Sequence, residues 1–312
     1  MGFVGGELAA GVPAFPESWY HLAMSRELPP GAALVRRVCG REVVAFRTER
    51  GVLGVLDAHC PHLGAHLGHG GRVVGEALRC PFHGLHWAPD GRCAGADDTP
   101  APGMRARARA WPVREVHGVA MVWYGAHGGE PAWEIPDLPM EGWSELRSHT
   151  LRIRGHVLEV AENGVDRRHF ATVHGYTDVS EFDVSVDGPV MRSRFDFKKD
   201  GVAQRFDTLV YGLGYALTDL RIQELGIHAR VILLSNQVDA ETVEFTVCAT
   251  VEGAAPWIDR FLAAIVDDVR KDVPIWEHKR RLSQPALIPS DGPIAKYRAF
   301  TRQFHPPDDT AA

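Results

Sequence analysis

The sequence has few cysteines, and their number is odd: five in 312 residues. A secreted disulfide framework needs paired cysteines at higher density, so we expect a protein of the reducing cytoplasm. Basic residues are outnumbered, with 34 Lys and Arg against 40 Asp and Glu, which argues against a dedicated nucleic-acid-binding protein. No run of 18 apolar residues occurs, so we expect no transmembrane helix.

Two further features are missing. The opening stretch MGFVGGELAAGVPAFP has neither a basic segment nor a long apolar core, so we expect no signal peptide. Internal repeats are also lacking, which excludes repeat architectures. The chain does have a 45% hydrophobic composition, enough for a core, and the length of two modest domains.

Two segments of different character divide the chain. From about Phe15 to Tyr124, short β-like runs alternate with Gly and Pro, which predicts an all-β domain over residues 15–125. From residue 140 to 312 we expect a domain with an antiparallel sheet. Helical spacing occurs in HVLEVAENGVDRRHFATVHG, period-two alternation in VEFTVCATV, and a long amphipathic helical pattern from Pro256. The predicted fold class is therefore α+β.

Two Cys-Pro pairs, each followed closely by a histidine, lie within CPHLGAHLGHGGRVVGEALRCPFHG. Cys60 is followed by His62 and Cys80 by His83, with the 17 residues 63–79 between the pairs. Two thiolates and two imidazoles could hold a tetrahedral zinc ion. They could also hold a [2Fe–2S] cluster, with both cysteines on one iron and both histidines on the other. The ligand set alone leaves both possibilities open.

The surroundings of these residues favour the cluster. Proline after each cysteine removes a backbone donor and stiffens the loop, and Gly64 and Gly84 allow the backbone to fold closely around a cluster. The units C-P-H-L-G and C-P-F-H-G resemble the Rieske motif, and FPESWYHLAMSRELPPG resembles the Rieske domain of ring-hydroxylating oxygenases. The resemblance implies a [2Fe–2S] cluster on Cys60, His62, Cys80 and His83. One departure is Leu85, where many members have Trp.

A second set of candidate ligands lies in ENGVDRRHFATVHG. His169 and His174 are about 140° apart around a regular helix, so one metal can meet both only at a distorted turn or near the helix end. Asn163, Asp166, His169 and His174 match N-x-x-D-x-x-H-x-x-x-x-H, which resembles the mononuclear iron motif of Rieske non-haem oxygenases. The resemblance implies an Fe(II) held by the two histidines and one carboxylate.

The carboxylate is expected on the long helical pattern. At 100° per residue, Asp272 falls inside the apolar face, Asp268 at its edge and Asp267 opposite it. A buried carboxylate needs a partner, because an unpaired buried charge is very costly. We predict that Asp272 is the iron ligand, with Asp268 as the alternative. A salt bridge from Asp272 to an arginine such as Arg168 would meet the same need.

The tail KDVPIWEHKRRLSQPALIPSDGPIAKYRAFTRQF is similar to that of 3-ketosteroid 9α-hydroxylase oxygenase components and Neverland-type cholesterol 7-desaturases. The resemblance implies a terminal oxygenase, an enzyme that hydroxylates an apolar steroid-like substrate with O₂. Electrons would come from NAD(P)H through a ferredoxin or a ferredoxin reductase. It also implies a homotrimer, in which Asp166 hydrogen-bonds His169 or His174 of its own chain and His83 of the adjacent one.

Alternatives to hydroxylation are open at this stage. The same iron chemistry serves desaturation or oxidative demethylation. A non-catalytic electron carrier or a zinc-stabilised binding protein is a third possibility, against which Asp166, His169 and His174 argue. Between Tyr176 and Val251 lie apolar runs such as LVYGLGYAL, which predict either a largely apolar substrate pocket or ordinary core strands.

Overall fold

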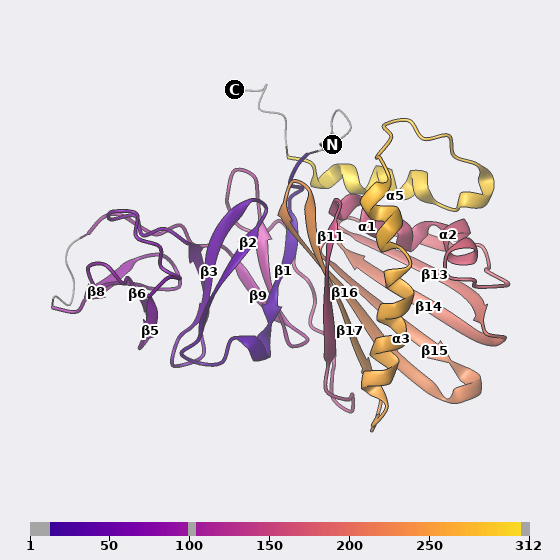
Figure 1. Cartoon of the computed structure of the whole chain (residues 1–312), viewed down its shortest axis with the longest axis horizontal. Coiled ribbons are helices and arrows are strands. Elements are labelled where there is room, and N and C mark those ends of the chain that lie inside the picture. Colours follow the sequence, from indigo (N-terminus) through magenta and orange to yellow (C-terminus); the bar gives the residue numbers. More distant parts are fainter. Residues whose placement is uncertain (1–12, 99–103, 307–312) are drawn as a thin grey trace. The chain divides into compact units, whose positions relative to one another are not determined.

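The computed structural model describes residues 13–98 and 104–306, which form two compact units. The N-terminal unit is Tyr20–Leu138. The C-terminal unit consists of the described residues up to Trp19 together with those from Pro139 onward. Figure 1 shows a small all-β unit and a unit in which helices accompany one large sheet, so the predicted α+β class is confirmed.

The N-terminal unit contains three small sheets, with strand orders β1-β10-β9, β2-β3-β4 and β5-β6-β7-β8. Residues 48–52 join β3 to β4, and the two strands pair antiparallel from Arg47 opposite Leu53. The strands are β1 (Ser18–Met24), β2 (Ala33–Val38), β3 (Arg41–Arg47), β4 (Leu53–Asp57), β5 (Arg72–Val74), β6 (Ala77–Arg79), β7 (Leu85–Trp87), β8 (Cys93–Ala96), β9 (Val113–Val116) and β10 (Val119–Tyr124).

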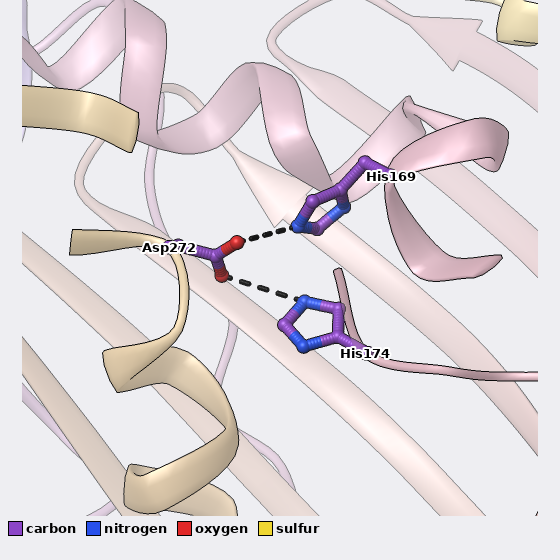
Figure 2. Close-up of side chains that lie close together, drawn as sticks. All are labelled: His169, His174 and Asp272. Atoms are coloured by element: carbon purple, nitrogen blue, oxygen red, sulfur yellow. Dashed lines mark hydrogen bonds and ion pairs between the residues drawn. The ribbon is translucent and has the colours of Figure 1, made fainter. Parts of the chain in front are cut away.

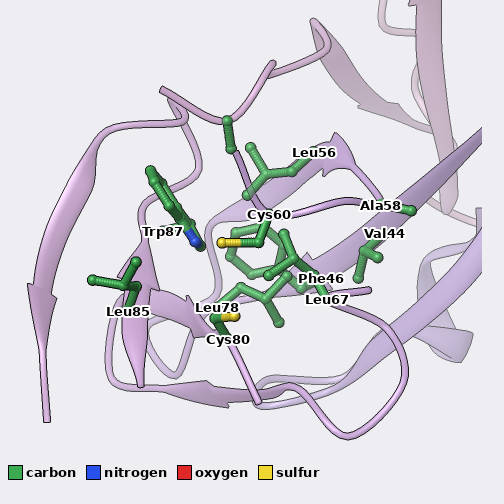
Figure 3. Close-up of a cluster of buried hydrophobic side chains, with 11 residues drawn as sticks. Val44, Phe46, Leu56, Ala58, Cys60, Leu67, Leu78, Cys80, Leu85 and Trp87 are labelled. Carbon is green, nitrogen blue, oxygen red and sulfur yellow. The ribbon is translucent and has the colours of Figure 1, made fainter. Parts of the chain in front are cut away.

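A buried cluster supports the two cysteine-bearing loops of this unit (Figure 3). Phe46 from β3, Leu78 from β6 and Trp87 from β7 are fully buried in it. Cys60 and Cys80 belong to the same cluster, so both loops are anchored in the core. Leu85, noted above as a departure from the Rieske pattern, is buried there as well.

The C-terminal unit is built on one antiparallel sheet of seven strands, in the order β11-β17-β16-β15-β14-β13-β12. Strands β12 to β17 follow one another as a meander, and the last of them pairs with β11. The strands are β11 (Arg147–Arg154), β12 (Asp183–Asp187), β13 (Val190–Lys199), β14 (Val202–Tyr211), β15 (Tyr215–Ile222), β16 (Ile227–Asp239) and β17 (Thr242–Val251).

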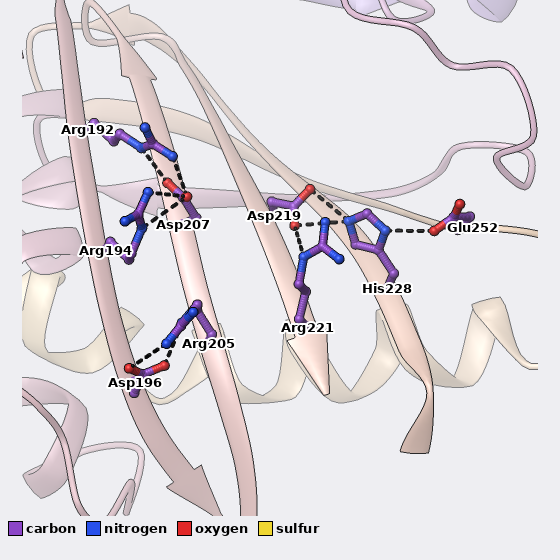
Figure 4. Close-up of polar contacts among 9 residues, drawn as sticks. All are labelled: Arg192, Arg194, Asp196, Arg205, Asp207, Asp219, Arg221, His228 and Glu252. Atoms are coloured by element: carbon purple, nitrogen blue, oxygen red, sulfur yellow. Dashed lines mark hydrogen bonds and ion pairs between the residues drawn. The ribbon is translucent and has the colours of Figure 1, made fainter. Parts of the chain in front are cut away.

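The two faces of this sheet differ in chemistry. On β13, β14 and β15 charged residues recur at alternate positions over part of each strand, and they form ion pairs with one another and with His228 and Glu252 (Figure 4). The pairs are Arg192 and Arg194 with Asp207, Arg205 with Asp196, Arg221 and His228 with Asp219, and His228 with Glu252. The alternating residues are mostly buried on the other face, as the period of two requires.

One strand prediction needs correction. VEFTVCATV was expected to be half-buried, but β17 is buried on both faces over most of its length, with Thr246 and Cys248 fully buried. The reason is its place inside the sheet, between β11 and β16, with α3 (Ile258–Arg270) packed against it.

Both predicted long helices are broken. The first becomes α1 (Val157–Glu162), a 3₁₀ turn (Asn163–Val165) and α2 (Arg167–Thr172). The second ends as α3 at Arg270 and resumes as α4 (Val273–His278). Pro274 explains this break, because it has no N–H for the Arg270 carbonyl and its ring crowds that carbonyl. The remaining helix is α5 (Ile294–Thr301), and the other 3₁₀ turns are Ser25–Glu27, Gln223–Leu225, Pro289–Asp291 and Arg302–Phe304.

Helices long and apolar enough to cross a bilayer are not found in the part of the chain that the structure describes.

Candidate metal centres

Two tight loops present the cysteines and histidines of the first predicted site. The Cys60 carbonyl accepts a hydrogen bond from the Gly64 N–H at 2.9 Å, and the Cys80 carbonyl accepts one from the Gly84 N–H at 3.2 Å. Both glycines have left-handed backbones, with φ of 77° and 65°, which L side chains rarely adopt. The two loops therefore close in the same way around their candidate metal ligands.

The four candidate ligands differ in exposure. Cys60 and Cys80 are 2% and 1% exposed, whereas His62 and His83 are exposed, with ring centroids 4.9 Å apart. Burial raises the pKa of the Cys60 thiol, so its thiolate needs a metal partner. The indole nitrogen of Trp87 acts in the opposite direction, since its hydrogen bond with Cys60 lowers the pKa of the thiol, and Figure 3 shows this nitrogen turned toward the Cys60 sulfur.

This donor set fits a two-iron cluster better than a single ion. A tetrahedral zinc site draws its donor atoms to one point. Within residues 13–98 and 104–306, the only group of three or more His, Cys, Asp or Glu whose donor atoms converge within 4.8 Å lies elsewhere. Two buried thiols and two exposed imidazoles match a cluster with cysteines on one iron and histidines on the other.

The converging group consists of His169, His174 and Asp272 in the C-terminal unit (Figure 2). One oxygen of Asp272 lies 2.6 Å from His169 Nε2, and the other lies 3.4 Å from His174 Nε2. The Asn163 amide nitrogen lies 3.3 Å from the same His169 nitrogen. Two imidazoles and one carboxylate, all three side chains buried, fit the ligand set of a non-haem Fe(II) with open positions.

The breaks in the helices bring these side chains together. His169 lies in α2, and His174 follows the end of α2 at Thr172, so the 140° separation of a regular helix does not apply. Asp272 occupies the gap between α3 and α4 and is 4% exposed. The alternative partner Arg168 instead donates a hydrogen bond to the Ser290 hydroxyl at 3.2 Å.

Asp268, the alternative ligand, lies behind His174. Its Oδ1 is 3.4 Å from His174 Nδ1, the ring nitrogen on the far side from Asp272. The Tyr176 hydroxyl and the Lys199 ammonium each donate to its Oδ2 at 2.8 Å, and Lys271 donates to Oδ1 at 2.7 Å. Asp268 thus supports a ligand instead of joining the ligand group. Sequence reasoning missed Tyr176 and Lys199, because no motif surrounds either residue.

The electrostatics of the group favour a cation. Burial alone would lower the pKa of His174, but hydrogen bonds with Asp268 and Asp272 outweigh burial and raise this pKa to about 9. Burial would raise the pKa of both aspartates, yet the hydrogen bonds from the histidines and Lys199 hold each pKa below its ordinary value. The two carboxylates therefore stabilise positive charge at His174, whether a proton or a metal supplies it.

Asp166 does not make the contact predicted within its own chain. Its carboxylate accepts a hydrogen bond from the backbone N–H of His169 at 3.0 Å and so caps α2, and within the described parts of the chain it contacts neither imidazole. The unpaired N–H groups of a helix start attract a short acidic side chain, which explains the difference. His169 Nδ1 is buried and has no hydrogen-bond partner among the described residues.

A cavity of about 340 Å³ opens beside the three ligands. Its wall combines the buried face of strands β13 to β16 with residues of α2 and α3. Most lining side chains are apolar, among them Phe170, Phe195 and Phe206, and the LVYGLGYAL run contributes Val210 and Leu213. The size lies in the range of small-molecule sites. The predicted apolar pocket is present, and the same runs also form sheet strands.

Replacement of Asp268 by asparagine is expected to weaken Fe(II) binding by roughly 10–100-fold, the usual effect of losing a partner behind a metal ligand. Asparagine keeps the size of the side chain but removes the charge that faces His174 Nδ1. The apparent affinity is measured anaerobically by competition with a chromophoric chelator. Asp267→Asn is the matched control, because Asp267 is exposed on the same helix and pairs with Arg270. Equal affinities in both variants would contradict the supporting role.

Comparison with known proteins covers both sites. Residues 18–113 match the model of the Rieske [2Fe-2S] domain, and residues 122–305 match that of the 3-ketosteroid 9alpha-hydroxylase C-terminal domain. A 3-ketosteroid-9-alpha-monooxygenase oxygenase component of Rhodococcus rhodochrous is 30% identical, over 93% of this chain and 84% of its own. Cholesterol 7-desaturase nvd 1 of Ciona intestinalis is 28% identical, over 94% of this chain and 69% of its own.

Solved structures share the fold at lower identity. NdmA of Pseudomonas putida CBB5 with caffeine superimposes with a TM-score of 0.74 at 17% identity, covering 94% of this chain and 97% of its own. Dicamba monooxygenase bound to dicamba gives a TM-score of 0.71 at 19% identity, covering 92% of this chain and 96% of its own.

Proposed function

Since the chain belongs to the Rieske oxygenase family, in the branch with a 3-ketosteroid 9α-hydroxylase C-terminal domain, and is therefore an oxidoreductase, we propose that it hydroxylates an apolar, steroid-like substrate. The observation that carries this proposal is the apolar cavity opening onto His169, His174 and Asp272. An electron carrier would need neither the cavity nor these three residues.

The residues have distinct tasks in this proposal. Cys60, Cys80, His62 and His83 would hold the [2Fe–2S] cluster, and His169, His174 and Asp272 would hold the mononuclear Fe(II). When bound, these groups supply one-electron transfer and the activation of O₂. A ferredoxin or a ferredoxin reductase would deliver the electrons from NAD(P)H.

The chain itself contributes binding, orientation and shielding. The aromatic and aliphatic wall of the cavity binds apolar rings and excludes water from the reacting centre. The Asp268 carboxylate faces His174 Nδ1 at 3.4 Å, and hydrogen bonds from Tyr176 and Lys199 hold Asp268 there. These contacts would keep the metal-binding atoms of the chain in place while the substrate reacts.

Desaturation is the second candidate function. The similarity to cholesterol 7-desaturase extends over the same length of chain as the similarity to the monooxygenase, and the same iron site serves both reactions. Oxidative demethylation also remains compatible with this site.

Product analysis tests the proposal. The loaded enzyme is incubated with a surrogate ferredoxin and reductase, NADH, isotope-labelled O₂ and either androst-4-ene-3,17-dione or cholesterol. We expect a product that has gained one labelled oxygen atom, whereas a product that has only lost two hydrogens would favour desaturation. Failure of a broad sterol and ketosteroid panel, together with turnover of a small polar aromatic, would exclude the steroid class.

Electron transfer between chains is part of the proposal. We infer a homotrimer in which Asp166, whose carboxylate holds the backbone N–H of His169, also hydrogen-bonds His83 of the adjacent chain. A heterologous contact of this kind closes into a ring under threefold symmetry. The position of Asp166 at the start of α2, three residues before His169, supports the inference, and the second ring nitrogen of His169, Nδ1, has no hydrogen-bond partner among the described residues.

Replacement of Asp166 by asparagine separates this role from helix capping. Asparagine caps a helix as well as aspartate, so α2 and the iron content should be unchanged. Single-turnover electron transfer from the reduced cluster, followed by cluster absorbance, should slow severely. Asp259→Asn is the control, an exposed acidic residue in the first turn of α3. A normal rate in Asp166→Asn would exclude the bridge, and a fully active monomer in sedimentation would exclude the route between chains.

A further inference from the structure

Three hydroxyl side chains cross the cavity wall in a row. Ser193 on β13 stands opposite Thr208 on β14, and Thr208 stands opposite Thr218 on β15. All three line the cavity, and we call them the hydroxyl row. On the next strand Val231 lies opposite Thr218, so the row ends there.

Apolar residues surround the hydroxyl row on the same face of the sheet. Met191 and Phe195 flank Ser193 along β13, and Phe206 and Val210 flank Thr208 along β14. On β15 the flanking residues are Ala216 and Leu220. The row is therefore a narrow polar line with apolar residues on both sides of it, and Gln204 and Ser235 are further polar residues of the sheet that line the cavity.

The hydrogen bonds of the row are incomplete. Thr208 Oγ1 and Thr218 Oγ1 lie 2.9 Å apart, and this bond uses one of their two hydroxyl protons. Ser193 is 2% exposed, and its Oγ has no hydrogen-bond partner within residues 13–98 and 104–306. A buried hydroxyl without a partner is rare in folded proteins, and its presence in a binding cavity points to a ligand atom.

The row carries no charge, and nearby charges are engaged elsewhere. Among the charged groups of the cavity wall, Lys199 bonds Asp268 at 2.8 Å and Asp272 bonds His169 at 2.6 Å. The arginines that flank Ser193 in the chain pair with Asp207 among the alternating charged residues (Figure 4). A neutral line of hydroxyls suits an uncharged oxygen better than a carboxylate or phosphate, which would need a positive partner.

We propose that the hydroxyl row determines substrate specificity by binding an uncharged oxygen substituent, a ketone or a hydroxyl group, on an otherwise apolar ring system. Ser193 Oγ and the spare proton of the threonine pair donate to that oxygen, and a substrate hydroxyl can donate in return. This rests on the proposed function, namely that an apolar polycyclic ligand fills the cavity. Anchoring one oxygen fixes which C–H bond of the ligand faces His169, His174 and Asp272.

Binding of four related steroids to wild type and Ser193→Ala tests the proposal. The ligands are androst-4-ene-3,17-dione, androst-4-en-3-one, androst-4-en-17-one and the oxygen-free androst-4-ene. Dissociation constants are measured by quenching of tryptophan fluorescence, with the metal-loaded protein kept anaerobic and without reductase. Ser193→Ala should weaken binding about tenfold for ligands with the anchored oxygen, the effect of one lost hydrogen bond, and leave androst-4-ene unchanged.

The threonine pair provides a second variant and a matched control. The double variant Thr208→Val with Thr218→Val removes the spare proton while keeping side-chain shape. Like Ser193→Ala, it should weaken binding of the ligands that carry the anchored oxygen and leave androst-4-ene unchanged. Thr150→Val is the control, because Thr150 bonds Thr246 across another strand pair, and neither lines the cavity. It should leave all four constants unchanged.

The outcomes separate the two proposals. If the wild type binds the steroids but Ser193→Ala weakens none of them, or all four equally, the hydroxyl row is overturned while the steroid class stands. If the wild type binds none of the four, the steroid class of the proposed function is overturned.

Discussion

Replacement of His174 by alanine is expected to eliminate turnover while the iron–sulfur spectrum stays intact. His174 and Asp272 stand on opposite sides of the same small space, with His169 as the third member. Loss of one of only three donors removes the site, so the effect should exceed the roughly 10–100-fold typical of an outer partner such as Asp268. The cluster residues belong to the other compact unit. The colour of the cluster and the electron paramagnetic resonance signal of its reduced form should therefore persist.

Three measurements on each variant check this prediction: iron per chain, the electron paramagnetic resonance signal of the reduced cluster, and product formed. Asp272→Ala should behave like His174→Ala. His149→Ala is the control, because His149 is an exposed β11 residue beside Arg270. Full activity in Asp272→Ala together with an inactive Asp268→Ala would show that the two carboxylates have the opposite roles.

Replacement of Cys80 by serine is expected to abolish the red-brown colour of the purified protein and all turnover. A serine hydroxyl does not ionise at neutral pH as a metal-bound thiol does, so one iron loses a ligand. Cys80 is also 1% exposed within the core that anchors both loops, so no neighbouring water can replace the sulfur freely.

Visible absorption and acid-labile sulfide per chain check the loss of the cluster. Cys93→Ser is the matched control, since Cys93 lies at the edge of the same core and its thiol donates to the Gly95 carbonyl. That variant should keep its colour. Colourless, zinc-loaded wild-type protein from iron-replete cells would contradict the assignment of Cys60, His62, Cys80 and His83 to a cluster.

The candidate cluster residues could be predicted from the sequence because their chemistry is local. Each loop closes on itself within a few residues, from Cys60 to Gly64 and from Cys80 to Gly84, so spacing alone carries the geometry. Asp272 was found through the face of a helix that is in fact broken. Its place beside His169 and His174 was predictable because the break comes only after Arg270, so the side chains of α3 keep the regular period almost to Asp272.

Residues brought together by long-range packing could not be predicted in the same way. Lys199 lies in the charged segment KKD, which is typical of a solvated strand end, yet its ammonium binds the buried Asp268. Tyr176 follows the last histidine without any motif of its own. The period of two shows which strand residues share a face, but only the assembled sheet shows that Ser193, Thr208 and Thr218 form one row.

The alternation along β13, β14 and β15 has a consequence for directed evolution. Residues that face the cavity and residues that form the charged pairs occupy different positions in the same strands. A mutant library confined to the cavity-facing positions therefore reshapes the substrate site without touching the ion pairs of the other face. New substrate ranges can be sampled on this scaffold while the strand pairing, and with it the yield of folded variants, is preserved.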